Sequence, residues 1–274
     1  MELYTTTSYE AARLLTLNYS TSFGQSSKLF APDMRDHIYA IYGLVRIADE
    51  IVDTYKGKDA AKLLKDFEAE TFAALRSGYS TNPIIHAFVT TAKRFGISRD
   101  LLRPFFKSMR MDLKPLAFTT HAYNQYIYGS AEVIGLMCLK VFCDDDALYK
   151  KLEPGARALG AAYQKVNFLR DIAADYHERG RVYFPGVTFE AFNEKKKAMI
   201  LRDITKDFAK AKPAVASLPI GARKAVAVSF VYYSELLRKL ERTSAEKLKT
   251  TRIRVSTPKK IQLFVGTALR KGAL

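Results

Sequence analysis

The sequence predicts an all-α protein that folds as a single domain over residues 1–274. Apolar residues recur at helical spacing through nearly the whole chain, and no series of alternating apolar and polar residues indicates a sheet. No stretch repeats with a period of about 20–50 residues, which favours a large bundle of roughly ten helices over a solenoid. A chain of this length buries about three quarters of its unfolded surface, so its core needs no disulfide or structural zinc.

Composition places the chain among ordinary globular proteins. Hydrophobic residues make up 48% and charged residues 26%, which excludes disorder as the dominant state. The two cysteines, Cys138 and Cys143, do not match a zinc-ligand pattern and indicate a reduced, cytoplasmic compartment. Residues 1–7 lack the basic and apolar parts of a secretory signal, and no apolar run approaches the roughly 20 residues that span a bilayer. We therefore expect a soluble protein without a membrane anchor.

The net charge of +16, from 44 Lys and Arg against 28 Asp and Glu, is compatible with more than one role. An excess of this size suits nucleic acid, an anionic membrane surface, a phosphate-rich substrate, or solubility alone. The chain has no zinc-finger pattern, no RNA-recognition signature and no phosphate-binding P-loop. We therefore expect no nucleic-acid partner, and the charge by itself does not distinguish a membrane surface, a phosphate-rich substrate and solubility.

Local signals mark helix ends in order along the chain. Periodicity predicts helices over residues 35–55 and 59–77. Asn82 then serves as an N-cap before Pro83 at the first helical position, and Gly96 ends that helix. The remaining predicted helices are one capped by Ser98, others over residues 120–142, 153–178 and 219–240, and a last one from Pro258.

Two short stretches interrupt this pattern. Residues 179–181 end the helix before them, and residues 182–186 predict an extended turn. The acidic triplet of residues 144–146 resembles a metal-binding cluster, but it follows a helix end, so we interpret it as a loop with an N-cap.

Two of the predicted helices carry acids among apolar residues. In the helix over residues 35–55, one stripe contains Tyr42, Arg46, Asp49 and Asp53. The two carboxylates lie one turn apart on a buried face, where like charges repel and desolvation adds to the cost. A cation is therefore expected between them, either a metal ion or Arg46 in an ion pair.

The helix over residues 153–178 repeats the pattern. Its stripe contains Gly160, Gln164, Asn167, Asp171 and Asp175. Four acids that share one cavity require divalent cations, and a donor set of oxygen atoms without His or Cys favours Mg²⁺, with Mn²⁺ as an alternative. Such an ion typically binds through carboxylates together with the phosphates of a substrate.

The remaining charged residues include candidates for binding anionic groups of a substrate. The candidate anion binders are Arg46, Arg170, Arg181, Arg252, Arg254, Lys259 and Lys260. Residues 195–197, three consecutive lysines, are interpreted as a solvated surface. The four histidines show no ligand spacing and are assigned no role.

These motifs, taken in order from about residue 8 to 270, resemble those of the squalene/phytoene synthase family. The matching segments are residues 20–23 (STSF), Arg35 with Arg46 and residues 49–53 (DEIVD), residues 126–137 (YIYGSAEVIGLM), residues 159–175 (LGAAYQKVNFLRDIAAD) with 180–185 (GRVYFP), and residues 252–255 (RIRV) with Lys259 and Lys260. The chain departs from the family pattern at Thr21, where many members have a basic residue, and at Glu132, where many have glycine.

The resemblance implies one isoprenoid-synthase domain with its active site in a central cavity between the two Asp-rich helices. It implies a prenyltransferase that condenses two identical prenyl diphosphates head to head (1′-1). By matching positions, the metal ligands would be Asp49, Asp53, Asn167, Asp171 and Asp175. Substrate would contact Ser20, Ser22, Phe23, Arg46, Gln164, Asn167, Arg170 and Arg254. Tyr126 would lie at the reacting centre with the four aspartates.

The variant of the mid-chain motif, GSAEVIG over residues 129–135, is most similar to microbial phytoene synthases. It implies two geranylgeranyl diphosphates as substrates and phytoene, a carotenoid precursor, as product by way of prephytoene diphosphate. The alternative is a squalene or dehydrosqualene synthase acting on farnesyl diphosphate, and NADPH is expected only for squalene. Pocket depth at Leu136, Ala156 and Leu159 would decide the chain length.

A more distant alternative is a non-catalytic scaffold that keeps the fold, but all four aspartates argue against it. The hydrocarbon product does not dissolve in water, so we expect the basic surface to contact anionic membrane peripherally. The sequence predicts no oligomeric state.

Overall fold

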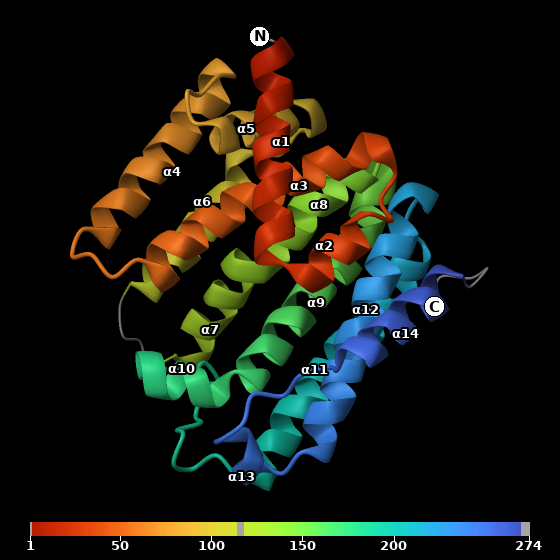
Figure 1. The fold of residues 1–274 in the computed structure, drawn as a ribbon. Coiled ribbons are helices and arrows are strands. Elements are labelled where there is room, and N and C mark those ends of the chain that lie inside the picture. The colour runs from red at the N-terminus through yellow and green to blue at the C-terminus, as the bar shows by residue number, and fades with distance from the viewer. Residues whose placement is uncertain (1, 114–117, 270–274) are drawn as a thin grey trace.

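The computed structural model describes residues 2–113 and 118–269, without the side chains of Thr21, Ser22 and Arg179. Every regular element in these residues is a helix, which confirms the all-α class (Figure 1). The first half contains α1 (Glu2–Tyr19), α2 (Thr21–Ser27), α3 (Pro32–Asp49), α4 (Ala60–Ser77), α5 (Pro83–Phe95), α6 (Arg99–Asp112), α7 (Thr120–Ile127) and α8 (Val133–Phe142). The second half contains α9 (Asp146–Arg170), α10 (Ile172–Arg179), α11 (Glu194–Ala216), α12 (Ile220–Arg242), α13 (Ala245–Leu248) and α14 (Thr257–Ala268).

The predicted caps are confirmed. Asn82 Oδ1 accepts a hydrogen bond from the backbone N–H of Ile84 at 3.0 Å. Gly96 ends α5 with φ of 65°, in the left-handed region that favours glycine. Asp145 in the acidic triplet caps α9 by accepting from the backbone N–H of Leu148 at 2.7 Å, as the loop-and-cap interpretation predicts.

The helix predicted over residues 153–178 begins and breaks elsewhere. It starts at Asp146, so Pro154 lies in its interior, and it breaks at Asp171 into α9 and α10. The carbonyl that loses its helical partner at Pro154 is that of Lys150. Lys150 is exposed, so water can bond this carbonyl and the helix continues.

Two predicted helices contain a π-helical turn. The chain over residues 35–55 continues from α3 into η1 (Glu50–Thr54), and α7 and α8 are joined by η2 (Tyr128–Glu132). These wider turns change which side chains share a face. In η2, a Cβ at Gly129 would lie 2.2 Å from the carbonyl oxygen of Pro104, so only glycine allows α6 to approach this closely.

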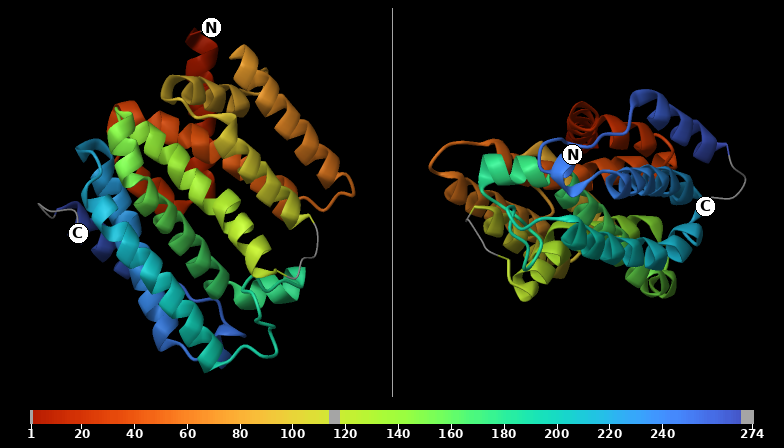
Figure 2. Two further views of the ribbon diagram at one scale, coloured as in Figure 1. Left: turned by 180° about the vertical axis from the view of Figure 1, so that it is seen from behind. Right: turned by 90° about the horizontal axis from the view of Figure 1, so that it is seen from below.

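Helix α9 occupies the middle of the bundle. It packs against η2 and α8 on one side and against α11 and α12 on the other, while α1 covers α3 and α5. Figure 2 shows the same order from behind and from below. The prediction of a solvated lysine run is wrong for Lys197, because its side chain is buried and its Nζ donates to the carbonyl oxygen of Thr243 at 2.6 Å.

Within the described part of the chain, we find no helix with the length and apolar character needed to cross a bilayer. Both cysteines are free. Burial raises the pKa of the Cys138 thiol to about 12, so it behaves as an inert core residue.

A buried histidine ties α1, α3 and α5 together. His37 Nδ1 lies 2.9 Å from Thr91 Oγ1 and 3.1 Å from the Tyr9 hydroxyl. Burial lowers the pKa of His37 to about 4, and the positive charge of Arg94 lowers it further while Asp33 opposes the shift.

We expect this histidine to destabilise the protein in acid. The unfolded chain binds a proton below pH 6.5, whereas the folded state resists it until about pH 4, so the free energy of unfolding falls as the pH decreases through this window. Between pH 7 and pH 5 the loss from this group is about 2 kcal/mol. Urea unfolding at both pH values measures it. His37→Gln should make the free energy of unfolding less dependent on pH, whereas His121→Gln, at an exposed site, should leave its pH dependence unchanged. The same pH dependence in both variants would contradict the prediction.

Candidate active site

Acidic residues from distant parts of the sequence gather at one end of the bundle. The C-terminal ends of α3 and α6, the start of α7 and the whole of α10 lie together there, as Figures 1 and 2 show from opposite sides. The first acidic motif ends α3 and enters η1, and the second crosses the break between α9 and α10.

The first motif places a carboxylate in an unfavourable environment. Burial, together with the negative charges of Asp53, Asp112 and Glu50, raises the pKa of Asp49 to about 7. Arg46 opposes the shift. Asp49 and Asp53 are therefore neighbouring, partly buried acids whose charges repel each other, and a cation held between them would relieve that repulsion.

Arg46 does not pair with these aspartates in the structure. Its guanidinium forms an ion pair with Glu50 and lies 4.5 Å from the ring centroid of Tyr19. The sequence pattern allowed an ion pair for Arg46, but it favoured an aspartate as the partner. Because Arg46 is only partly buried, it can still exchange Glu50 for a phosphate oxygen.

A third carboxylate, Asp112, was not found by the sequence analysis. It lies buried at the end of α6 and accepts hydrogen bonds from the Tyr126 hydroxyl at 2.8 and 2.9 Å. Arg181 forms an ion pair with it at 3.2 Å and also donates to its backbone carbonyl. Arg181 was predicted to bind anions, but the structure uses it to hold Asp112.

Tyr126 lies in an aromatic wall beside these charges. Its ring contacts those of Phe118, Phe168 and Tyr183, with centroids 5.3 to 5.8 Å apart. Burial raises the pKa of Tyr126 well above its usual value, and the charges of Asp112 and Asp53 add to the shift. Tyr126 therefore stays protonated, and its hydroxyl lies against Asp112 at the acidic end of the bundle.

The second motif meets the C-terminal basic segment. Asp171 accepts from Arg170 Nε at 2.9 Å and pairs with Arg252 Nε at 2.7 Å. Arg254, which the family pattern favoured, is exposed, and its carbonyl oxygen accepts from Lys239. The structure thus brings Arg252, rather than Arg254, to the aspartate. Burial, then the charge of Asp112 and then that of Asp175 raise the pKa of Tyr183 to about 12, so Asp175 lies within electrostatic range of the aromatic wall.

The polar residues that precede Asp171 on α9 lie between the acids and a cavity. Asn167 Oδ1 accepts from the Tyr233 hydroxyl at 3.4 Å. Gln164, one turn earlier, lines the cavity itself. The stripe predicted on this helix therefore runs from the aspartates to the cavity.

Among the side chains of residues 20–23 that the structure describes, that of Phe23 reaches the cavity. Phe23 lines it and stacks on Tyr42 with ring centroids 5.3 Å apart. Ser20 Oγ caps α2 by accepting from the backbone N–H of Phe23 at 3.2 Å. Ser22 lies in α2, but its side chain is outside the described part of the structure.

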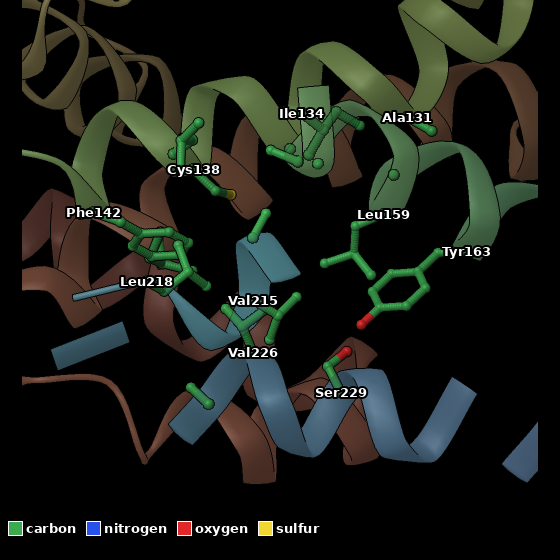
Figure 3. A pocket seen from close by; sticks show the side chains of 18 of the residues that line it. Ala131, Ile134, Cys138, Phe142, Leu159, Tyr163, Val215, Leu218, Val226 and Ser229 are labelled. Carbon is green, nitrogen blue, oxygen red and sulfur yellow. The ribbon is translucent and has the colours of Figure 1, made fainter. Parts of the chain in front are cut away.

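The cavity has a volume of about 290 Å³ and an almost wholly apolar lining from α2, η2, α8, α9, α11 and α12. Figure 3 shows Tyr163 and Ser229 at one end and Phe142 with Leu218 at the other. Phe142 stacks on Phe30 with ring centroids 5.4 Å apart, and both line the cavity. Ala156 and Leu159 line it as predicted. Leu136 does not belong to the described lining and is buried elsewhere, so that prediction is wrong.

The donor set at the acidic end suits a hard divalent cation. Asp49, Asp53, Asp171 and Asp175 offer only oxygen atoms, and the pKa of Asp49 is raised by burial first and then by the charge of Asp53. In the described residues, no three His, Cys, Asp or Glu side chains stand close enough together to enclose an ion by themselves. A metal here would therefore need ligands from substrate and water, as is common for Mg²⁺ with phosphates.

Comparison with known proteins agrees with this geometry. The model of one family, Squalene/phytoene synthase, matches residues 16–259. A phytoene synthase of Arthrospira platensis is 29% identical, over 86% of this chain and 84% of its own. A 15-cis-phytoene synthase of a Synechocystis strain is 30% identical, over 70% of this chain and 60% of its own. The crystal structure of a dehydrosqualene synthase in complex with ligand superposes with a TM-score of 0.80 at 19% identity, covering 96% of this chain and 95% of that one.

Proposed function

Since this chain belongs to the squalene/phytoene synthase family, we propose that residues 1–274 form one catalytic domain that joins two geranylgeranyl diphosphates into phytoene. Membership makes the protein a prenyltransferase of the phytoene synthase type. In the first step the double bond of one substrate forms two carbon–carbon bonds to C1′ of the other, closing a cyclopropane as one diphosphate and one proton leave, which gives prephytoene diphosphate. In the second, the other diphosphate and another proton leave as the skeleton rearranges, so no reductant is needed.

One observation carries the proposal: along α9, polar and acidic residues follow directly after the residues that line the apolar cavity. Gln164 lines the cavity, Asn167 follows one turn later, and Asp171 ends the helix. A substrate with a long hydrocarbon tail and a charged head matches this polarity, because the tail gains from leaving water and the head reaches cations.

The residues at the acidic end fit Mg²⁺, or Mn²⁺ in its place, held by Asp49, Asp53, Asn167, Asp171 and Asp175. A bound divalent cation would neutralise negative charge on the departing diphosphate. Arg46, Arg170 and Arg254 would bind the phosphate oxygens, and we add Arg252 because it already lies against Asp171.

The aromatic residues protect the reacting carbons. Tyr126, Phe168 and Tyr183 pack in contact, and Phe168 stacks on Tyr183 at 3.9 Å between centroids. Their faces stabilise positive charge that develops when a diphosphate leaves, and the apolar lining excludes water that would quench it. Tyr126 also donates to Asp112, which fixes its ring in this position.

The farnesyl alternative stays open because the relatives include a 4,4′-diapophytoene synthase that is 27% identical, while the superposed dehydrosqualene synthase at 19% identity supports only the shared fold. Purified protein incubated with Mg²⁺ and either radiolabelled diphosphate, without NADPH, decides between them when the hexane extract is chromatographed. A C40 hydrocarbon from geranylgeranyl diphosphate alone supports the proposal. A C30 hydrocarbon assigns a dehydrosqualene synthase, and presqualene diphosphate that awaits NADPH assigns a squalene synthase. Folded protein without product from either substrate would support the non-catalytic scaffold.

The depth of the cavity should determine which length of prenyl diphosphate the protein accepts. Ala156 lines the cavity between its two ends, so Ala156→Phe should fill the space that a longer chain occupies. We expect kcat/KM for geranylgeranyl diphosphate to fall by about tenfold or more relative to farnesyl diphosphate. Met199→Phe, an exposed site on α11, is the matched control. An unchanged ratio of the two kcat/KM values in a folded Ala156→Phe variant would place the hydrocarbon tail elsewhere.

The product has to leave for an apolar phase, because a C40 hydrocarbon does not dissolve in water. We therefore propose that the protein is cytoplasmic and contacts anionic membrane peripherally through its basic surface, without a nucleic-acid partner.

A further inference from the structure

Helix α14 exposes an apolar stripe that the bundle does not cover. Ile261 is 59% exposed and Val265 is 46% exposed, while Leu269, just after the helix, is 79% exposed. Positions four residues apart lie on one face of a helix, so these three side chains form a single row. Large apolar side chains that gather in this way, rather than singly, indicate contact with another apolar surface.

Contacts between α14 and α12 fix where this row lies. The two helices run antiparallel, because Lys239 Nζ donates to the carbonyl oxygen of Arg254 at 2.9 Å and Lys260 lies 5.7 Å from the ring centroid of Tyr232. The Leu269 end of α14 is therefore at the same end as Ile220, the first residue of α12, which is 83% exposed. Figures 1 and 2 show α14 on the same side of the molecule as α1.

The row lies in the most basic part of the chain. Residues 219–269 contain eleven Lys and Arg against three Glu, a net charge of +8 and half that of the protein. Two of the three glutamates are paired within this segment, Glu235 with Arg238 and Glu246 with Lys249. The surface around the apolar row is therefore complementary to a surface of negative charge.

Helix α12 borders both the substrate cavity and α14. Ala225 and Val226 line the cavity, and Leu218, just before α12, lies at its far end beside Phe142. The end of the cavity that is farthest from Gln164 and the exposed row of α14 therefore both adjoin this helix.

We propose that Ile261, Val265, Leu269 and Ile220 insert into an anionic lipid bilayer, with the basic residues of α12 and α14 in contact with its headgroups. This orientation turns the hydrocarbon end of the cavity toward the membrane that receives the product, a purpose that rests on the proposed function. Binding to the membrane depends only on the exposed apolar row and the basic residues around it, and not on the proposed reaction. A second copy of the chain is a poorer occupant, since it would bring two segments of +8 together.

Sedimentation with vesicles tests the proposal on the full chain without substrate. We expect binding to vesicles of phosphatidylcholine with about one third phosphatidylglycerol, and weaker binding when NaCl is raised from about 0.1 to 0.5 M. Ile261→Ser with Val265→Ser and Leu269→Ser should lower the partition coefficient about tenfold or more. The matched control is Leu63→Ser with Met199→Ser, which removes exposed apolar side chains from α4 and α11 and should change little.

Several results would overturn the proposal. Equal binding by the triple variant and the control variant, or equal binding to pure phosphatidylcholine, would remove the role of this surface. A dimer in gel filtration that the triple variant abolishes, with vesicle binding unchanged, would assign the row to a second copy. Turnover of the triple variant in detergent is measured separately: it should match the unmodified protein, so loss of vesicle binding is distinguishable from failure of the proposed reaction.

Discussion

Replacing Asp49 and Asp171 together by asparagine is expected to lower turnover at least about 10³-fold while the protein remains folded. Each substitution removes one negative oxygen from one of the two acidic motifs. The site then loses charge that a divalent cation needs on both sides of the diphosphate. Binding of the apolar tail should persist, because neither residue lines the cavity.

Although turnover should fall, the free energy of unfolding should not fall when Asp49 is replaced. Burial and the neighbouring charges of Asp53 and Asp112 penalise its ionised form in the folded state. An amide carries no charge, so Asp49→Asn should leave the free energy of unfolding unchanged or raise it by up to about 2 kcal/mol above pH 7. Asp171 is mostly shielded by Arg170 and Arg252 near the surface, and its replacement should cost less than about 1 kcal/mol.

Turnover assays with saturating Mg²⁺, combined with urea unfolding of the same preparations, measure both effects. The matched control is Asp66→Asn, which breaks an exposed ion pair with Lys62 and should leave turnover unchanged. Loss of turnover accompanied by unfolding would give the aspartates a structural role, and turnover within about tenfold of the original would remove them from the chemistry.

The parts of the fold that sequence could predict are those encoded locally. Asn82, Ser98 and Asp145 act on backbone groups two or three residues away, so a short window contains both partners of each cap. The two acidic stripes were also local, because carboxylates that recur among apolar residues at helical spacing imply a shared buried face. That reasoning predicted that the four acids share one cavity, which stays a prediction, and it relied on the family resemblance for their roles.

The features that could not be predicted from the sequence depend on packing between segments that are distant along the chain. The π-turns η1 and η2 leave the apolar periodicity almost unchanged, and the requirement for Gly129 comes from the Pro104 carbonyl on another helix. Lys197 gave the same signal as its exposed neighbours, since the carbonyls that bind it are 44 and 46 residues away. Asp112 stands alone at a helix end, and its partners Tyr126 and Arg181 are 14 and 69 residues away.

Removing the carboxylate of Asp112 should strongly destabilise the protein. It is buried with an ion pair to Arg181 and two hydrogen bonds from Tyr126, so it connects α6, α7 and the segment after α10. Asp112→Ala would leave the Arg181 charge without its carboxylate. We expect it to lower the free energy of unfolding by about 3–5 kcal/mol, the usual consequence of breaking a buried pair from one side. Glu10→Ala, which breaks the exposed pair with Arg13, should cost less than about 1 kcal/mol.

A milder variant separates stability from positioning. Asp112→Asn keeps the size of the side chain and some of its hydrogen bonds, so the protein should remain folded at 25 °C. Tyr126 would then lose the charged acceptor that fixes its ring beside Asp53. In the reaction that we propose, Tyr126 lies at the reacting centre, so we expect kcat to fall about 10²-fold with little change in KM.

A double-mutant cycle identifies the cause of that fall. If Asp112 acts through the hydroxyl of Tyr126, the loss in kcat from Asp112→Asn should shrink to a few-fold when Tyr126 is already phenylalanine, and the coupling energy in urea unfolding should be about 1.5–3 kcal/mol. Additive effects of the two substitutions would instead show that Asp112 acts independently of Tyr126. Its remaining connections, to Arg181 and through its charge to Asp49, would then have to account for the lost turnover.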